Sequence, residues 1–194
     1  MVFAVATNNQ KKLKEIQRIL DSFGIQAKTL KELGIQVEIE EDGTTFEENA
    51  IIKARTIAQM SNLPTISDDS GLEVDALNGA PGVFTARYAG ENATDDDNIN
   101  KLLEILEGIP KEERNARFVS AVCLYMPDGR HTVCRGTCEG WIGTERIGEG
   151  GFGYDPIFMV GDKSYSQMSP EDKDAISHRG EALRKLKDEI KKFI

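Results

Sequence analysis

The stretch Thr65–Leu72 (TISDDSGL) constrains the fold more than any other part of the chain. A short β-branched run follows Pro64, which is typical of a buried strand. Asp68 and Asp69 come directly after this run. Polar residues at the carboxyl edge of a sheet are where α/β proteins place ligands. We therefore expect a strand that ends in a functional site.

The neighbouring carboxylates of Asp68 and Asp69 indicate a cation. Two adjacent carboxylates repel each other unless a cation or a shared proton lies between them. Oxygen ligands favour Mg²⁺, and Mn²⁺ is a substitute with similar preferences. The alternative is a solvated turn, because Asp, Ser and Gly are ordinary turn residues. Lysines, an arginine and a glycine-rich loop elsewhere in the chain suit a dication and a phosphate chain, and they favour the site.

The length fits one domain over residues 1–194 that is long enough to bury a core. Hydrophobic residues make up 39% of the chain and charged residues 29%, as in a globular protein. No apolar run approaches the roughly 20 residues of a membrane span, so we expect no membrane partner. The first residues lack the basic region of a secretory signal, and we expect a cytoplasmic protein.

The net charge of −9 argues against a nucleic-acid partner, which requires a basic face. An acidic protein can still bind a nucleotide if its few cations converge with a metal on one cleft. Cys123, Cys134 and Cys138 are an odd number with spacing unsuited to a metal site. We interpret them as incidental thiols in a reducing compartment.

A predicted anion site lies near the N-terminus. Residues 2–6 favour a short strand, and apolar residues at helical spacing predict a helix ending near Gly24. The turn Thr7–Lys12 between them would present backbone N–H groups and a helix dipole to a phosphate. The alternative is an ordinary N-cap followed by solvated lysines.

A second strand is expected at 25–30, and a long helix begins after Thr44 and Thr45, each of which has a glutamate three residues on. Lys53 lies beside the apolar stripe of this helix, and such a lysine usually extends to solvent. It would be functional only if its neighbours brought it near the metal. The acidic segment 38–43 fits a solvated loop.

The second half of the chain carries further element signals. Thr94 with Asp97 predicts a helix start, and 118–125 and 131–141 predict a hairpin around 127–129. Ser169 followed by Pro170 predicts another helix start, and an apolar stripe follows to the C-terminus.

Glycines are dense over 148–156, where they allow a backbone to approach a ligand closely. Phe152 or Tyr154 could offer a ring for a base to stack on. The spacing is not that of a P-loop, and a bulged turn between strands is the alternative.

Six motifs together resemble the inosine triphosphate pyrophosphatase family, also called the dITP/XTP pyrophosphatases. They are Thr7-Asn8-Asn9 through Lys12, Phe46–Ala50 with Lys53-Ala54, Ser67–Leu72, Gly79–Gly82, Gly150–Pro156 and Ser177–Gly180. The resemblance runs from residue 2 to near the C-terminus in the family's motif order. Asn8 departs from the glycine of many relatives, but both residues tolerate positive φ, so we expect the turn to survive.

The resemblance implies Mg²⁺-dependent hydrolysis of ITP, dITP and XTP to the nucleoside monophosphate and pyrophosphate, which keeps deaminated purines out of nucleic acids. It implies that Asp69 accepts a proton from the attacking water, with Asp68 close by, and that Glu40 or Glu41 shares the metal with Asp69. The sequence does not decide between the two glutamates. The remaining roles are phosphate binding by Thr7, Asn8, Asn9, Gln10, Lys11, Lys12 and Lys53, substrate contact by Ser70, and a base pocket of Phe152, Gly153, Tyr154, Asp155, Lys173, His178 and Arg179.

The family also implies a fold and an assembly. We expect a mixed, elongated central sheet flanked by helices, two lobes with the active-site cleft between them, and a homodimer. For Arg179, the alternative to reading the base is pairing with a phosphate or a carboxylate.

Two alternative functions, from other classes of protein, fit the sequence less well than a pyrophosphatase. A response-regulator receiver domain also combines an acidic pair, Mg²⁺ and a lysine, but it is shorter and carries its acidic pair after the first strand. A non-catalytic purine-nucleotide sensor would share the pocket and lack turnover.

Overall fold

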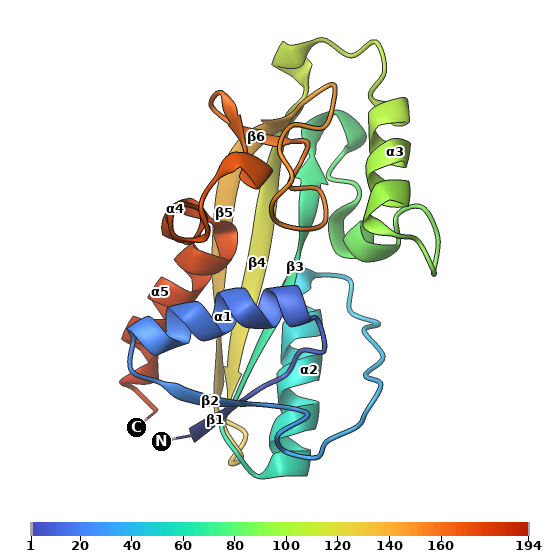
Figure 1. Cartoon of the computed structure of the whole chain (residues 1–194). Helices are drawn as coiled ribbons and strands as arrows, with labels where there is room; N and C mark the ends of the chain where they lie inside the picture. The colour runs from blue at the N-terminus through green and yellow to red at the C-terminus, as the bar shows by residue number, and fades with distance from the viewer. Residues whose placement is uncertain (1, 194) are drawn as a thin grey trace. The chain divides into compact units, whose positions relative to one another are not determined.

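A computed structural model describes residues 2–193 as a mixed α/β fold (Figure 1). One seven-stranded sheet has the order β2-β1-β3-β4-β5-β6-β7. The strands are β1 (Val2–Val5), β2 (Gln26–Thr29), β3 (Thr65–Val74), β4 (Asn115–Tyr125), β5 (His131–Ile142), β6 (Phe158–Val160) and β7 (Lys163–Ser164). The helices are α1 (Gln10–Ser22), α2 (Phe46–Ser61), α3 (Asp95–Ile105), α4 (Pro170–Ile176) and α5 (His178–Ile190), with short 3₁₀ turns between some of them.

The sheet is mixed, as expected from the family resemblance. β1 pairs in parallel with β2 and with β3, whereas β6 pairs antiparallel with β5 and with β7. The tight turn between β4 and β5 confirms the predicted hairpin, because Met126 N–H donates to the Arg130 carbonyl at 2.8 Å.

The chain divides into two compact units. Unit 1 contains the chain up to Asp69, Ser120–Gly136 and the chain from His178 onward, and unit 2 contains Ser70–Val119 and Thr137–Ser177. β3, β4 and β5 each contribute residues to both units. The expected cleft between two lobes stays a prediction.

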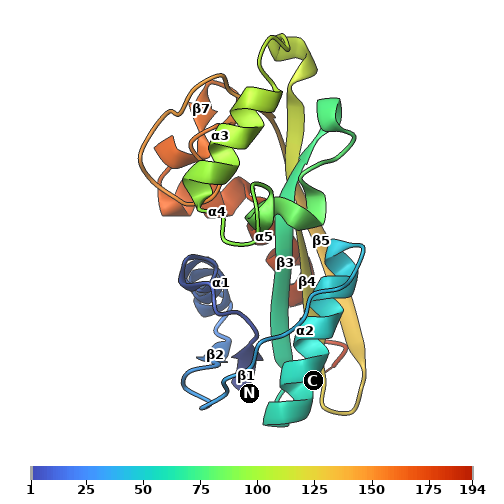
Figure 2. The same ribbon diagram turned by 90° about the vertical axis from the view of Figure 1, so that its right-hand side faces the viewer.

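In unit 1, helices cover both faces of the sheet. The alternation along β1 places Phe3 and Val5 in a core with residues of α1 and α5, and places Ala4 and Ala6 in a second core with Ile57 of α2. Figure 2 shows α1 and α2 on opposite sides of β3. Side chains that point to opposite faces of β3 therefore meet different helices.

Unit 2 has its own core around three aromatic rings. Phe118, Phe158 and Tyr165 lie with ring centroids 4.6 to 5.5 Å apart, in edge-on and stacked arrangements. Leu72 of β3 and Leu102 of α3 are fully buried in the same cluster. Tyr154 of the glycine-rich segment that follows β5 belongs to the same core.

The predicted helix starts are confirmed. The Thr45 hydroxyl accepts from Glu48 N–H at 3.1 Å at the start of α2, and Thr94 and Asp97 form a capping box at α3. Ser169 caps α4 with Pro170 at its first position. No helix within residues 2–193 combines the length and apolar character needed to cross a membrane.

One expectation about β3 is wrong. The strand does not end at the acidic pair but runs unbroken from Thr65 to Val74. The residues after the pair keep the strand's alternation, because Leu72 and Val74 are both fully buried in the unit 2 core. Asp68 and Asp69 therefore lie in the middle of a continuous strand.

Candidate active site

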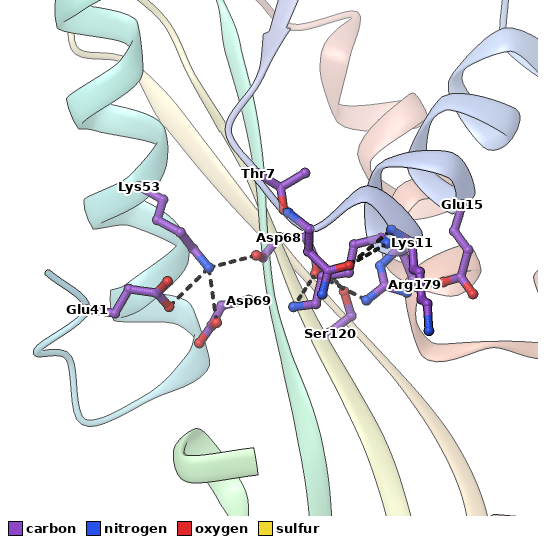
Figure 3. Close-up of polar contacts among 11 residues, drawn as sticks. Thr7, Lys11, Glu15, Glu41, Lys53, Asp68, Asp69, Ser120 and Arg179 are labelled. Carbon is purple, nitrogen blue, oxygen red and sulfur yellow. Dashed lines mark hydrogen bonds and ion pairs between the residues drawn. The ribbon is translucent and has the colours of Figure 1, made fainter. Parts of the chain in front are cut away.

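Asp68 and Asp69 point to opposite faces of β3 (Figure 3). Successive side chains of a strand alternate between faces, so neighbours in sequence have different surroundings. Asp68 meets Lys12 of α1 and Arg179 of α5, whereas Asp69 meets Lys53 of α2. This corrects the interpretation that one cation must lie between the two carboxylates, because each carboxylate has its own cations.

The Lys53 ammonium forms the centre of the Asp69 side. Lys53 Nζ donates to Asp69 Oδ1 at 3.1 Å, to Glu41 Oε2 at 3.1 Å and to the Asp68 carbonyl oxygen at 2.9 Å. Lys53 is 8% exposed and Asp69 is also 8% exposed. Lys53 does not extend to solvent, and its neighbours bring it to the acidic pair.

Glu41, and not Glu40, reaches this group. Between Leu33 and Gly43 the odd-numbered residues are half-buried and the even-numbered residues are exposed, as in an extended segment lying on the protein. Ile39 packs against the core that contains Ile57, and Glu41 follows on the same side. Glu40 is exposed.

The carboxylate of Asp68 is fully buried, and each of its two oxygens contacts at least one polar side chain. Ser120 Oγ donates a hydrogen bond to Asp68 Oδ1, while Lys12 Nζ and Arg179 Nη2 both lie 3.2 Å from Oδ2. Arg179 Nη1 donates to Glu15 Oε2, which belongs to the buried face of α1. The group therefore links β3, β4, α1 and α5.

The segment before α1 forms a side-chain N-cap, which matches the alternative expected for this turn, and its role in binding an anion stays a prediction. Asn9 Oδ1 accepts from Lys11 N–H at 3.0 Å and from Lys12 N–H at 3.2 Å, and Asn9 N–H donates to Thr7 Oγ1 at 3.1 Å. Asn8, Asn9, Gln10 and Lys11 are exposed, and Thr7 and Lys12 are half-buried. Asn8 is not among the positive-φ residues of the described chain, so the turn does not depend on that conformation.

Burial and neighbouring charges shift the pKa values of Asp69 and Lys53. Burial raises the pKa of Asp69, against the opposing effect of Lys53 and Lys12. Burial alone would lower the pKa of Lys53, but Asp69, Glu41 and Asp68 outweigh it and the pKa is raised. Lys53 thus stays protonated while Asp69 becomes a stronger base.

The carboxylate of Asp68 is held in its charged form. Burial would raise the pKa of Asp68, but Arg179, Lys12 and the Ser120 hydroxyl outweigh it and hold the pKa well below its usual range. Burial lowers the pKa of Lys12, against the opposing effect of Asp68. Asp68 therefore acts as a fixed negative charge for its cations.

A separate polar group lies in unit 2. Lys173 Nζ is 2.7 Å from Asp155 Oδ2, which also accepts from Phe152 N–H at 3.0 Å. The Lys173 nitrogen lies 4.9 Å from the centroid of the Phe152 ring. Gly151 has φ +76°, and a Cβ there would lie 2.1 Å from Asp155 Oδ2, so the loop requires glycine to wrap this carboxylate.

Of the two rings considered for base stacking, Tyr154 is in the core. It is 2% exposed, and its hydroxyl donates to the Thr85 carbonyl oxygen at 2.8 Å. Phe152 is half-buried beside Lys173. The structure therefore favours Phe152 as the ring that a ligand can reach.

The remaining predicted residues lie in both units. Ser70 is half-buried and belongs to unit 2, as does Gly153, whose N–H donates to Asp95 Oδ2 at 2.9 Å. His178 and Arg179 are buried at the start of α5 in unit 1. The contacts of Arg179 with Asp68 and Glu15 match the carboxylate-pairing alternative, and its role in reading a base stays a prediction.

Sequence reasoning missed Glu15 and Ser120. Each carried a signal, because Glu15 lies three residues after Lys12 on the apolar face of a predicted helix, and Ser120 interrupts the apolar run of a predicted strand. A polar residue at a buried position requires a partner. The partners of both lie far away in sequence.

The oxygen atoms near Lys53 fit a magnesium ion. Glu41 Oε2 and Asp69 Oδ1 both lie 3.1 Å from one nitrogen, so the two carboxylates already converge on a single positive charge. Within residues 2–193, no three His, Cys, Asp or Glu side chains are arranged to hold a metal. Mg²⁺ usually takes one or two carboxylates together with substrate phosphates and water, so this pair is sufficient.

Known proteins resemble this chain over nearly its whole length. The profile of the Ham1 family matches residues 3–189. A dITP/XTP pyrophosphatase of Bacillus cereus is 48% identical over 96% of this chain and 93% of its own length. One from Vibrio parahaemolyticus is 50% identical over 94% of this chain and 92% of its own.

Solved structures agree with this match. The Staphylococcus aureus Ham1 protein superimposes with a TM-score of 0.88 at 42% identity, covering 100% of both chains. A Mycobacterium abscessus protein described as a nucleoside-triphosphatase and dITP/XTP pyrophosphatase gives a TM-score of 0.77 at 45% identity, covering 96% of this chain and 98% of its own. The family predicted from the sequence motifs is confirmed, and the chain belongs to the Ham1 family.

Proposed function

We propose that the protein is a nucleoside triphosphate pyrophosphatase that hydrolyses dITP, ITP and XTP to the monophosphate and pyrophosphate with Mg²⁺. The observation that carries the proposal is the convergence of Glu41 and Asp69 on Lys53, in a chain 48% identical to an enzyme named dITP/XTP pyrophosphatase. Removal of deaminated purine nucleotides from the nucleotide pool is the role that follows from such a reaction.

The phosphate chain would bind at the N-terminus of α1. The dipole of α1 attracts anions at this end of the helix, and Lys12 adds a positive charge. Cleavage of a phosphoanhydride needs positioning and charge neutralisation more than covalent help from the protein. Lys12 and Lys53 supply this charge on opposite faces of β3.

Glu41 and Asp69 would hold the metal. A bound Mg²⁺ supplies charge neutralisation for the phosphate oxygens. Asp69 would orient the attacking water and accept its proton, because its raised pKa makes it a better base than an exposed carboxylate. Lys53 would turn from the carboxylates toward the phosphates when substrate and metal bind.

The polar group of Lys173, Asp155 and Phe152 in unit 2, called here the unit 2 group, suits a 6-oxopurine. Lys173 offers only hydrogen-bond donors, which match the 6-oxygen of hypoxanthine or xanthine and oppose the 6-amino group of adenine. The ring of Phe152 beside Lys173 can stack on the base. Selectivity for non-standard purines over ATP would follow from this mismatch.

A nucleotide panel with product analysis tests the proposal. We expect turnover of dITP, ITP and XTP with pyrophosphate as the first product, loss of activity with EDTA and recovery with Mg²⁺. Release of orthophosphate and IDP from ITP would contradict a pyrophosphatase. Tight binding of these nucleotides without turnover would instead favour a non-catalytic sensor.

A further inference from the structure

The two oxygens of the buried Asp68 carboxylate contact different groups. Oδ2 is shared by two cations, Lys12 Nζ and Arg179 Nη2, each at 3.2 Å. Oδ1 accepts from the hydroxyl of Ser120 on the neighbouring strand β4. Asp68 and Ser120 are 1% and 0% exposed, so water does not compete for these contacts.

We propose that Ser120 is a positioning residue for the phosphate subsite, and that it acts through Asp68 on Lys12. The hydroxyl fixes Oδ1 to the sheet and thereby directs Oδ2 toward the two cations. Lys12 is the member of this group that reaches the surface, since its side chain is 18% exposed and that of Asp68 is 0% exposed. The proposal rests on the proposed function only where it assigns Lys12 to the phosphates.

The hydrogen bond from Ser120 to Asp68 matters because a lysine ammonium has no preferred direction of its own. Lys12 has a long flexible stem, and its position depends on the acceptor that holds it. A hydrogen bond to a charged group is stronger than one between neutral groups, and a buried one is stronger still. Without the Ser120 hydroxyl, the carboxylate could rotate toward other donors, and Lys12 would lose its fixed acceptor.

Ser67 provides a matched control. It lies on β3, is 0% exposed like Ser120, and its Oγ donates to the Ala50 carbonyl oxygen at 2.6 Å. Ser67→Ala therefore removes one buried hydroxyl and one hydrogen bond, as Ser120→Ala does. The difference between the two variants is that only Ser120 contacts Asp68.

The first measurement is the reactivity of Lys12 in the full chain. Wild type, Ser120→Ala and Ser67→Ala are treated with trace acetic anhydride, and acetylation of Lys12 relative to exposed Lys14 is read by peptide mass spectrometry. We expect the ratio to rise several-fold in Ser120→Ala, because the ammonium is no longer held by Asp68. We expect the ratio of Ser67→Ala to equal that of wild type.

The second measurement is steady-state hydrolysis of dITP. We expect kcat/KM of Ser120→Ala to fall about tenfold, mainly through KM, because Lys12 contacts the phosphates in both the ground state and the transition state. Ser120→Cys keeps a weak S–H donor in a similar volume, so its ratio and its KM should lie between those of wild type and Ser120→Ala. If Ser120→Ala does not fold, Ser120→Cys is compared with Ser67→Ala instead.

Equal Lys12 labelling in Ser120→Ala and Ser67→Ala would overturn the proposal, as would equal KM values with a shared loss of thermal stability. If wild type hydrolyses no nucleotide but the labelling ratio still rises in Ser120→Ala, the proposed function fails and the positioning of Lys12 by Ser120 stands. The two failures are therefore distinguishable.

Discussion

At the scale of single residues, Lys53 explains how the buried carboxylate of Asp69 and the half-buried carboxylate of Glu41 stay close together. A buried ammonium is costly unless it is paired, and Lys53 is paired with Asp69, Glu41 and a backbone carbonyl. Its raised pKa keeps it charged at neutral pH, so its attraction for both carboxylates offsets the repulsion between Glu41 and Asp69. The same two oxygens would be free for a dication once Lys53 moves to a phosphate.

Asp69→Asn should abolish turnover and leave the fold intact. The amide keeps the shape of the side chain and removes both its basicity and one negative charge. General-base catalysis contributes about 10² to 10⁴ in rate, so we expect a loss of at least about a hundredfold in kcat. Circular dichroism and thermal melting check the fold, and a variant that keeps more than about a tenth of the wild-type rate would contradict the role.

Glu41→Gln and Glu40→Gln form a matched pair of neighbouring substitutions. Glu41 shares Lys53 with Asp69, whereas Glu40 is exposed. We expect Glu41→Gln to raise the Mg²⁺ concentration required for half-maximal activity about tenfold or more, and Glu40→Gln to leave it unchanged. A Mg²⁺ titration of dITP hydrolysis measures both, and the reverse order of effects would exclude Glu41 as the ligand.

Asp68 should make stability depend on pH in the acid range. Its pKa is lowered in the folded protein, so its contribution to the free energy of unfolding is fully present above the ordinary value of 3.8 and is lost as the pH falls. At pH 7 we expect Asp68→Asn to be about 3 kcal/mol less stable than wild type, because Arg179 and Lys12 lose a buried partner.

Urea unfolding of both proteins between pH 7 and pH 3 measures this difference. The gap in the free energy of unfolding between wild type and Asp68→Asn should shrink below about pH 4. Other carboxylates are common to the two proteins and cancel in the comparison. A gap that stays constant over the whole range would show that the charge of Asp68 is not what stabilises the fold.

At the scale of elements, local signals predicted the helices and the hairpin well. Capping residues such as Thr45, Thr94 and Ser169 act within one turn of the chain, so the sequence around them contains the whole cause. The continuation of β3 was less evident, because Asp, Ser and Gly are turn residues when they are exposed. Burial on both faces of the sheet overrides that preference here.

The candidate site was only partly predictable for the same physical reason. The sequence indicated the acidic pair and the lysines, but the partners of Asp68 lie 52 residues away at Ser120 and 111 residues away at Arg179. Such contacts depend on the order of strands in the sheet, which local patterns do not determine. The alternation from Ile35 to Ile39 could have selected Glu41 over Glu40, since it places Glu41 on the apolar side.

Gly136→Ala should disturb the contact between β5 and α5. A Cβ at Gly136 would lie 2.1 Å from the His178 carbonyl oxygen and 2.5 Å from Ala182 N, so backbone would have to move. Overpacking of this kind costs about 1 to 3 kcal/mol, and the start of α5 carries Arg179. We expect a lower thermal midpoint and a lower kcat/KM.

Gly143→Ala, one residue after the end of β5, is the control for this substitution. Its Cβ would have its nearest neighbour at 3.5 Å, which is ordinary van der Waals contact, and we expect nearly unchanged stability. Differential scanning fluorimetry compares the two variants. Equal thermal midpoints would show that β5 and α5 are not packed as tightly as the structure indicates.

At the scale of the whole molecule, the two units carry different chemistry. The unit 1 group combines three cations and four carboxylates, which suits a phosphate chain and a metal: Lys12, Lys53, Arg179, Glu15, Glu41, Asp68 and Asp69. The unit 2 group combines Lys173 with Asp155 and the ring of Phe152, which suits a base. Rate and selectivity should therefore respond to substitutions in different units.

Lys173→Met and Arg179→Met test this separation through the ratio of kcat/KM for ITP to that for ATP. A buried donor that faces the adenine amine instead of an oxygen costs about 1 to 3 kcal/mol, which is about fivefold to 150-fold in selectivity. Replacement of Lys173 removes this donor, so we expect the ratio to fall by about that factor even if overall activity also falls. Arg179 donates to Asp68 and Glu15, so we expect its replacement to lower activity on both substrates and leave the ratio nearly unchanged. A large fall of the ratio in Arg179→Met would instead show that Arg179 contacts the base. An unchanged ratio in Lys173→Met would show that the unit 2 group does not select the nucleotide.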